Sequence, residues 1–515
     1  MVESYSGNKF NCDVLIVGGG VAGCAAAIVA ARRGQRVLLL EKDYALGGIA
    51  TSGYVTGIAG CVEGMSKEWF ERMVELGWGR KLPNDLKHCV FDPSKAKMML
   101  ERMICEQGGR VLYGTYVIDA EVEDKQIKKV ICQSVSGRFE ISAKVYIDAS
   151  GDAVLSVAAG VPYAVGSPEF QGLNLSTTLA FRMAHVNFTK WTKYRAEWTK
   201  EEHKKPLKEQ DWNPVQANMD LAVKNGDLPY FVFPAAIFNP VPGFPLDNCD
   251  LIVMAAHSYF THTTDVEDIT RQIVEQHQQI LDFEKFYRKY LPGFENSMVT
   301  EIAPLLGIRD SRRVIGKTIF KASDIAFGTK FEDGIARFPE MFDTHHPTSP
   351  RLGFKRHIHV PKAEGSAVDI QSDMMCNGDM HPFGMPAGIQ VRPNPKDHCD
   401  IPFGALQPLN CDNLFVAGRC ISAEFDAVGG VRVIAPAMST GQAAAVAADY
   451  CIKNNILPTD VDGKIIHKLM IEEEKVPLDK LPDGHWEMMR GIEGEFVVDR
   501  SDSVHIIGKD GTFYR

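Results

Sequence analysis

Apolar residues near the N-terminus follow a pattern that changes twice over a short stretch. Residues 14–17 are all apolar, an alanine-rich run then continues to Gly34, and residues 37–40 are again all apolar. Short apolar runs bounded by turn residues favour buried strands, and the longer alanine-rich run favours a helix packed against them. A glycine-rich turn separates the first strand from the helix. This order predicts a βαβ unit with two parallel strands.

The glycines of this turn have the spacing of a dinucleotide-binding loop. Gly18 permits the tight turn, Gly20 lets the backbone approach a pyrophosphate because it has no Cβ, and Gly23 lets the helix pack against the sheet. The helix N-terminus presents N–H groups to that pyrophosphate. Glu41 ends the second strand, where a carboxylate accepts hydrogen bonds from ribose hydroxyls and repels a 2′-phosphate. The combination predicts a dinucleotide site.

A second glycine-rich loop follows, with Gly47 and Gly48 in succession. Its small residues would let the backbone lie along a flat cofactor, and Thr51 would add a hydroxyl contact. Together with Glu41 and Lys42, the two loops resemble the FAD-binding start of the glutathione-reductase-type flavoproteins. The resemblance implies that FAD is the dinucleotide and that these residues, Lys42 included, contact it.

Strand-like segments continue the pattern beyond residue 108. Three of them predict a meander: residues 109–113, 128–134 and 139–147. They lead into Asp148-Ala-Ser-Gly-Asp152, which resembles the element that returns the chain to the cofactor in these flavoproteins. The resemblance implies that Ser150, Gly151 and Asp152 contact FAD. Because Asp152 precedes a helix-like run, we also expect it to cap that helix.

The composition changes after residue 160. Residues 161–400 carry many prolines and aromatic residues in β-like runs, and one long helical pattern, Asp265–Tyr290, lies among them. A glycine-bracketed basic motif stands in the same region: Gly307-Ile-Arg309-Asp310-Ser311-Arg312-Arg313-Val-Ile-Gly316. We expect one or two of its arginines to bind an anionic group of the substrate or the flavin, or to pair internally with Asp310 or Glu301.

Two later motifs complete a recognisable order. They are Asn-Leu-Phe-Val-Ala-Gly-Arg-Cys-Ile-Ser at 413–422 and a glycine- and alanine-rich segment at 429–445. With the basic motif, they resemble the family of FAD-dependent oxidoreductases, over most of residues 13–458. The resemblance implies that Gly418, Arg419 and Val433 contact FAD.

The alanine-rich helix of the last segment, expected from about Ala437, has a physical task of its own. Its N-terminus would face the N1/O2 edge of the flavin, where negative charge appears on reduction. Arg432 precedes it and is a candidate for the same task, or else a surface or ion-paired arginine.

These patterns predict an α/β protein with a discontinuous, Rossmann-like FAD-binding domain of glutathione-reductase type and an inserted α+β substrate or cap domain. The expected boundaries are 1–160 and 401–458 for the two parts of the FAD-binding domain, 161–400 for the inserted domain and 459–515 for a C-terminal extension without an assigned role.

Fewer residues are candidates for catalysis than for cofactor binding. Cys61 follows the second glycine loop and is either close to the flavin ring or an inert buried thiol. His257 and His262 flank a strand-to-loop transition, and each is a candidate general base or a structural residue. The catalytic candidates are therefore Cys61, His257, Arg309 and Arg432. A loose histidine-rich stretch has no supporting carboxylate pattern, so we predict no metal site there: His345, His346, His357 and His359.

The composition argues against three classes of protein: nucleic-acid-binding, disulfide-stabilised and membrane-spanning proteins. A net charge of −10 without a Lys/Arg-rich stripe argues against nucleic-acid binding. The twelve cysteines are scattered without a CxxC pair, which favours a reducing cytoplasmic compartment over a disulfide framework. The uncharged stretch at 14–31 is interrupted by glycines, so a βα unit explains it better than a membrane span.

The absence of a second glycine fingerprint after residue 160 bears on the reaction. We expect electrons to pass directly between the flavin and a small-molecule substrate, or to involve a separate electron acceptor or donor protein. The predicted activity is hydride transfer at flavin N5, with oxidation of a C–H bond next to a hydroxyl or amine favoured over alkene reduction. Two alternatives stay open. One is a non-redox lyase, isomerase or hydratase that retains FAD structurally, and the other is an electron-relay flavin subunit of a complex.

Overall fold

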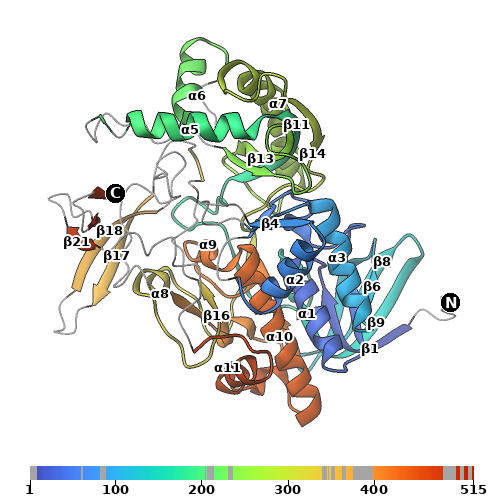
Figure 1. The fold of residues 1–515 in the computed structure, drawn as a ribbon. Helices are drawn as coiled ribbons and strands as arrows, with labels where there is room; N and C mark the ends of the chain where they lie inside the picture. The colour runs from blue at the N-terminus through green and yellow to red at the C-terminus, as the bar shows by residue number, and fades with distance from the viewer. Residues whose placement is uncertain are drawn as a thin grey trace.

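The structure is a computed structural model, and it places two groups of regular elements against each other. In Figure 1 the blue elements at the start of the chain lie on one side, and α5, α6, α7, β11, β13 and β14 form a green group above them. The described residues are 9–58, 62–81, 89–202, 204–205, 214–229, 236–338, 345, 347–349, 354–361, 367–374, 398–479, 494–498, 504–508 and 513–514.

The predicted βαβ unit is confirmed. β1 (Lys9–Val17) pairs in parallel with β2 (Val37–Leu40), and α1 (Val21–Arg32) connects them. β9 (Gly137–Asp148) pairs in parallel with the other side of β1. Because these strands are parallel, their carboxyl ends meet at one edge of the sheet, where a cofactor is bound in open α/β sheets.

The predicted meander is partly wrong. The run at 109–113 forms β6 (Arg110–Leu112), which pairs in parallel with β2 in the main sheet. The first strand of the meander is instead β7 (Tyr116–Glu123), which pairs with β8 (Gln126–Ser134), and β8 pairs with β9. β7 has no buried residue, and acidic residues interrupt its apolar ones, so a search for continuous apolar runs missed it.

A late segment completes the first layer. β20 (Leu414–Val416) pairs in parallel with β9, and α10 (Ile434–Asn454) packs along α1. A Cβ at Gly441 would overlap the carbonyl oxygen of Ala22 on α1, so the two helices approach closely because their side chains are small. The βαβ unit and the segment from β20 to α10 therefore share one hydrophobic core.

A second sheet has its own hydrophobic core. It is antiparallel, with four strands in the order β12 (Ile237–Pro240), β13 (Cys249–Ser258), β11 (Thr177–Val186) and β14 (Met298–Ile302). The long helix α7 (Val266–Tyr290) packs on this sheet. Asp265, where the predicted helical pattern starts, caps α7 by accepting hydrogen bonds from the amides of Glu267 and Asp268.

The other described elements surround these two layers. The helices are α2 (Gly64–Glu75), α3 (Pro93–Glu106), α4 (Val154–Ala158), α5 (Phe188–Glu202), α6 (Pro214–Lys224), α8 (Ala322–Phe327), α9 (Val428–Val431) and α11 (Gly463–Glu472). The strands are β3 (Gly57–Ile58), β4 (Gly79–Lys81), β5 (Cys89–Phe91), β10 (Tyr163–Val165), β15 (Arg312–Val314), β16 (Gly334–Phe338), β17 (Phe354–Pro361), β18 (Ala367–Met374), β19 (Cys399–Pro402), β21 (Gly494–Val498), β22 (Val504–Gly508) and β23 (Phe513–Tyr514). Within the described ranges, every helix is too short or too polar to cross a bilayer.

Candidate cofactor and substrate site

The first glycine turn lies at the carboxyl edge of the parallel sheet. Gly18 has a φ of +101°, and a Cβ there would lie 2.5 Å from the Cα of Ser150, at the end of β9. A Cβ at Gly23 would overlap the carbonyl oxygen of Gly18. Any larger residue at either position would push the turn away from the strand or the helix from the sheet. Both glycines are therefore required by packing.

The second glycine loop lies against the first. Gly47 donates its amide hydrogen to the carbonyl oxygen of Gly19 at 2.7 Å, and Gly47 and Gly20 form an isolated parallel bridge. A Cβ at Gly20 would meet no atom within 4 Å, although Gly20 stands at the N-cap of α1. The open space lies at a helix N-terminus, beside backbone without side chains. This geometry fits a pyrophosphate.

Glu41 is fixed beside this space. Its carboxylate accepts hydrogen bonds from the amides of Gly19 at 2.6 Å and Asp43 at 2.8 Å, and burial raises its pKa. Lys42 is exposed. The buried hydroxyl of Thr51 donates to the carbonyl oxygen of Leu46, and this bond joins the two ends of the second glycine loop. Glu41 keeps lone pairs for ribose hydroxyls, because each carboxylate oxygen has two.

The expectation that Asp152 caps the next helix is wrong. The N-cap of α4 is Ala153, in the left-handed region. The buried carboxylate of Asp148 accepts hydrogen bonds from the amide and hydroxyl of Ser156 at 2.7 Å, inside α4. The hydroxyl of Ser150 donates to Asp148 at 2.6 Å and accepts from the amide of Val154 at 2.9 Å. The chain reverses too tightly after β9 for the adjacent Asp152 to reach the helix, so the aspartate four residues earlier does so.

Asp152 instead joins three distant segments of the chain. Its carboxylate accepts hydrogen bonds from the hydroxyl of Ser311 at 2.7 Å and from Arg419 at 2.8 Å, and Arg419 also donates to Ser311 at 3.0 Å. Burial opposes ionisation of Asp152. However, Arg419, Ser311 and the positive charge of Lys42 outweigh it and hold its pKa below the usual value. Gly151 (φ +76°) leaves room for the guanidinium of Arg419.

Ser311 was not among the site residues predicted from the sequence, because the arginines and the aspartate beside it indicated only charge. Its hydroxyl group, within a glycine-bracketed motif, was the feature that could have identified it as a hydrogen-bonding residue.

The arginines of the basic motif have three different environments. Arg313 and Asp310 form a buried ion pair at 3.2 Å, which confirms the internal pairing considered from the sequence. Arg312 donates to the carbonyl oxygen of Asp152 at 3.1 Å. Arg309 is half-buried and donates to the carbonyl oxygen of Ser176 at 2.6 Å. Arg312 and Arg313 therefore fasten the motif to the chain, whereas Arg309 points toward the second sheet.

His257 and Arg309 form a pair that the sequence does not reveal. Arg309 Nη2 lies 3.1 Å from Nε2 of His257, and Nδ1 of His257 lies 2.8 Å from the carbonyl oxygen of Ala255. These contacts fit a neutral imidazole that donates from Nδ1 and accepts at Nε2. Burial, Arg309 and His345 together hold the pKa of His257 well below its usual value. His257 is thus arranged to position Arg309 and not to act as a free general base.

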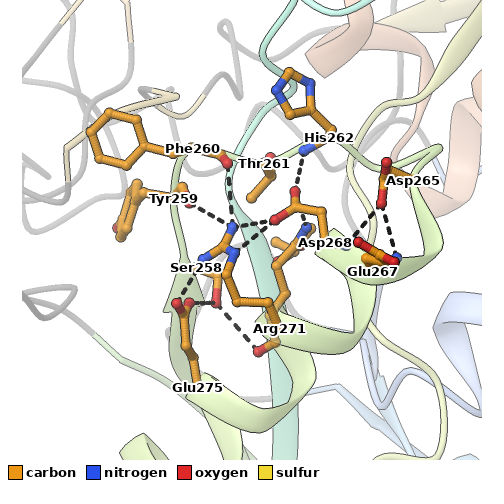
Figure 2. A network of polar contacts seen from close by, with 12 residues as sticks. Ser258, Tyr259, Phe260, Thr261, His262, Asp265, Glu267, Asp268, Arg271 and Glu275 are labelled. Carbon is orange, nitrogen blue, oxygen red and sulfur yellow. Dashed lines mark hydrogen bonds and ion pairs between the residues drawn. The ribbon is translucent and has the colours of Figure 1, made fainter.

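The other candidates lie elsewhere. Figure 2 shows His262 at the start of α7, where its amide donates to Asp268 at 2.5 Å; its ring is exposed. The helix α10 begins at Ile434, three residues earlier than expected, and Val433 is its N-cap. Arg432 directly precedes Val433. Gly418 donates its amide hydrogen to the hydroxyl of Thr440 on α10 at 2.9 Å, so this helix end meets the edge of the sheet. Cys61 lies outside the described residues.

The histidine-rich stretch is described only in part. The ring of His345 lies 5.8 Å from that of His257, measured between centroids. His346 lies outside the described residues, and β17, which carries His357 and His359, is described by its backbone alone. Among the residues that are described, no group of three or more His, Cys, Asp or Glu side chains is arranged to hold a metal ion.

The sequence matches the family of FAD dependent oxidoreductases over residues 13–470. The chain belongs to this family. It is an enzyme, its cofactor is FAD, and the open cradle at Gly20 is consistent with that cofactor. The family match includes the basic motif and the last glycine-rich segment, the two stretches that tie the cofactor edge to the rest of the chain.

Curated relatives resemble part of this FAD-dependent oxidoreductase. The digeranylgeranylglycerophospholipid reductase of Methanosarcina mazei is 29% identical over 166 residues, which cover 28% of this chain and 38% of the relative. The protein of the same name from Picrophilus torridus is 30% identical over 120 residues, 23% of this chain and 27% of the relative. The chain thus spans well under half the length of these relatives.

Solved structures resemble it more distantly. A geranylgeranyl bacteriochlorophyll reductase-like protein from Thermoplasma acidophilum has a TM-score of 0.41 and 13% identity, covering 93% of this chain and 86% of its own. The p-nitrophenol 4-monooxygenase of Pseudomonas putida has a TM-score of 0.40 and 10% identity, covering 96% and 91%. Likenesses at this level carry no information on the reaction.

Proposed function

We propose that this enzyme transfers a hydride between N5 of FAD and a small organic substrate, and that it oxidises a C–H bond next to a hydroxyl or an amine. FAD supplies the two-electron chemistry when it is bound. We also propose that the fold is of glutathione-reductase type, with the second sheet in an inserted substrate domain. The residues that would hold the cofactor are Gly18, Gly20, Gly23, Glu41, Lys42, Gly47, Gly48, Thr51, Ser150, Gly151, Asp152, Gly418, Arg419 and Val433.

The observation that carries the proposal is the attachment of the second sheet to the second glycine loop. Three hydrogen bonds join them: Leu305 N to Ser52 O at 3.1 Å, Tyr54 Oη to Glu301 Oε2 at 2.8 Å, and Asn239 Nδ2 to Thr56 Oγ1 at 3.3 Å. A sheet fastened to the cofactor loop can cover a substrate and exclude water from it. The arrangement therefore supports a substrate domain held next to the cofactor loop.

Arg309 is the residue that we propose to hold the substrate. Gly307, two positions before it, exchanges backbone hydrogen bonds with Thr178 of β11, and this pairing fixes the start of the motif on the second sheet. The guanidinium donates to the carbonyl oxygen of Ser176 and lies 3.1 Å from Nε2 of His257, and these contacts fix its orientation. A guanidinium matches the geometry of a carboxylate or another anionic group of a substrate. His257 would then keep Arg309 oriented.

Reduction of an activated alkene is the second candidate. The names of the curated relatives favour it, because those proteins are reductases. In that direction the electrons would come from a separate donor. The similarity covers 28% of this chain at most, so it leaves the direction to experiment.

The test is anaerobic mixing of the purified, FAD-loaded protein with a panel of hydroxy acids, amino acids and unsaturated acids. Bleaching of the yellow flavin absorbance by a hydroxy or amino acid would support oxidation. Recolouring of chemically reduced protein by an unsaturated acid would support alkene reduction.

Two outcomes would contradict hydride transfer. Turnover without any change in flavin colour would indicate a non-redox enzyme. Flavin that changes colour only with a partner protein would indicate an electron relay. Quench-flow sampling of product alongside the absorbance trace distinguishes these outcomes.

A further inference from the structure

The two faces of β11 differ in where their hydroxyl groups find partners. The hydroxyl of Thr177 donates to Gln272 of α7 at 2.7 Å. Its cross-strand neighbour on β13, Ser258, donates to a carboxylate of the same helix, as Figure 2 shows. Successive side chains of a strand alternate between the two faces of a sheet. Thr178 and its own cross-strand neighbour, His257, therefore lie on the face away from α7.

The face away from α7 lies next to the second glycine loop. Thr178 exchanges backbone hydrogen bonds of 3.1 and 2.8 Å with Gly307. A Cβ on Gly307 would lie 3.5 Å from Cδ1 of Ile49 in that loop. A Cβ on Gly48, beside Ile49, would lie 3.2 Å from the Cα of Gly20. Gly307 thus connects Thr178 to the loop that packs on the cofactor cradle.

Two buried hydroxyl groups in this region have no hydrogen-bond partner within the described part of the chain. They belong to Thr178, which is 8% exposed, and to Ser176, which is 0% exposed. The backbone of each residue is paired, because the carbonyl oxygen of Ser176 accepts from Arg309 and Thr178 bonds with Gly307. A buried hydroxyl without a partner costs free energy, so the unpaired pair indicates a ligand that supplies the missing hydrogen bonds.

We propose that Ser176 and Thr178 bind the hydroxyl group of a 2-hydroxy acid whose carboxylate is held by Arg309. The inference rests on the proposed function, and it selects one class among the proposed substrates. Nη1 of Arg309 lies 2.6 Å from the carbonyl oxygen of Ser176, so the guanidinium is next to one of the two hydroxyl residues. His257, which contacts Arg309, stands directly opposite Thr178, a pairing that separates Cβ atoms by about 5 Å.

Charge favours a hydroxyl over an amine in this position. An ammonium group beside Arg309 would meet a like charge, and a serine or threonine hydroxyl carries no negative charge to offset it. The nearest acidic residues of the basic motif and of β14 have other partners: Asp310 pairs with Arg313, and Glu301 accepts from Tyr54. An acid with neither substituent would leave both hydroxyl groups unpaired.

The test is calorimetric titration of the FAD-loaded, full-length protein, with the flavin chemically reduced and kept anaerobic. Reduced flavin cannot accept a hydride, so a hydroxy acid binds without reacting. The probes are two matched sets of acids, with both enantiomers where they exist: 2-hydroxybutanoate, 2-aminobutanoate and butanoate, and mandelate, phenylglycine and phenylacetate. In at least one set, we expect the hydroxy acid to bind at least about tenfold more tightly than the other two acids.

Variants of neighbouring threonines separate binding from structure. Thr178→Val should raise the Kd of the preferred hydroxy acid about 3- to 10-fold and leave that of the unsubstituted acid unchanged. Its Tm should stay the same or rise, because the hydroxyl that it removes is unpaired, whereas a structural role would lower it. Thr178→Ser keeps the hydroxyl and should keep the preference. Thr177→Val, on the opposite face, is the matched control: it should lower the Tm and leave the preference unchanged.

Three outcomes would overturn the inference: no binding by any of the acids, equal binding of the three acids in both sets, or a preference that Thr178→Val leaves intact. Hydride transfer is judged separately, from bleaching of the oxidised flavin. A preferred hydroxy acid that never bleaches the flavin would contradict the proposed function alone. Bleaching by an amino acid, without any preference for hydroxy acids, would contradict this inference alone.

Discussion

The two sides of the candidate site are built by different means. At the cofactor edge, backbone atoms and missing side chains define the shape: Gly18 and Gly23 allow contact, and Gly20 leaves open space. On the proposed substrate side, polar side chains define it, as in the contact between Arg309 and His257. Gly23 meets a residue five positions away, Gly18, whereas Arg309 and His257 are 52 positions apart.

This difference has consequences for tolerance to substitution. A glycine in a tight turn cannot be replaced without moving the backbone, so its loss affects the whole layer. A surface-accessible side-chain contact can be lost while the fold persists. We expect effects to decrease from the glycine corner to the buried pair, and then to the half-buried and peripheral contacts.

The largest effect is expected for Gly23→Val. Its side chain would overlap the carbonyl oxygen of Gly18 and separate α1 from the sheet, so we expect loss of more than about 4 kcal/mol of stability or an insoluble protein. Gly20→Ala is the matched control in the same turn. It should change the stability of the apoprotein by no more than about 1 kcal/mol and weaken FAD binding at least about tenfold. Thermal unfolding and FAD titration measure both, and a Gly23→Val protein that folds and binds FAD normally would refute the packing account.

The next effect is expected for Asp310→Asn. The substitution removes the carboxylate that is ion-paired with the buried guanidinium of Arg313, so we expect a loss of about 3 kcal/mol in urea unfolding. Glu472→Gln removes one partner of an exposed pair with Lys468 and serves as the control, with a loss below about 0.5 kcal/mol. Equal losses in the two variants would show that burial does not set the strength of the pair.

A smaller effect, on function alone, is expected for Arg309→Lys. Lysine cannot donate simultaneously to Ser176 and His257 and hold an anionic group, so we expect KM for an anionic substrate to rise about 10- to 100-fold with less change in kcat. His257→Gln should raise KM less, because Arg309 itself remains. Steady-state kinetics against a neutral analogue provide the control, and an equal rise in KM for that analogue would exclude anion binding by Arg309.

The smallest effect concerns acid stability. Burial opposes ionisation of Asp449, but Lys453, Gln35 and Arg33 outweigh it and lower its pKa. A carboxyl whose pKa is lower in the folded state stabilises the fold above its unfolded pKa of about 3.9, and that stability is lost as the pH falls through the folded pKa. Between about pH 5 and pH 2, Asp449→Asn should therefore lose less stability than the unaltered chain, by about 1 kcal/mol. Parallel acid unfolding curves for the two proteins would contradict this.

Much of the cofactor edge could be predicted from the sequence, because local rules govern it. The glycine spacing, the apolar strands and the acid at Glu41 all act within one βαβ unit. The prediction that Asp152 caps α4 was wrong, because two aspartates precede that helix and either could cap it by sequence alone. Asp152 and Asp148 both precede α4, and only the path of the chain after β9 determines that Asp148 reaches the helix amides. The meander was misassigned because β7 has no buried residue and acidic residues interrupt its apolar ones.

The proposed substrate side could be predicted only as a set of candidate residues. Arg309 and His257 were both singled out, but nothing in their local sequence shows that they touch across a separation of 52 positions. His257 was considered a general base because imidazole titrates near neutral pH. Its burial and the adjacent guanidinium lower its pKa, and neither is visible without the fold.

The sequence by itself determined the βαβ unit, the positions where only glycine fits, the long amphipathic helix α7 and the family of the chain, since each follows from neighbours along the chain or from an ordered set of motifs. The tertiary structure alone decided which charges meet. It joined Asp152 to Ser311 and Arg419 and paired Arg309 with His257. The physical reason is that hydrophobic spacing and backbone geometry act over a few residues, whereas ion pairs, burial and pKa depend on which distant segments fold against each other.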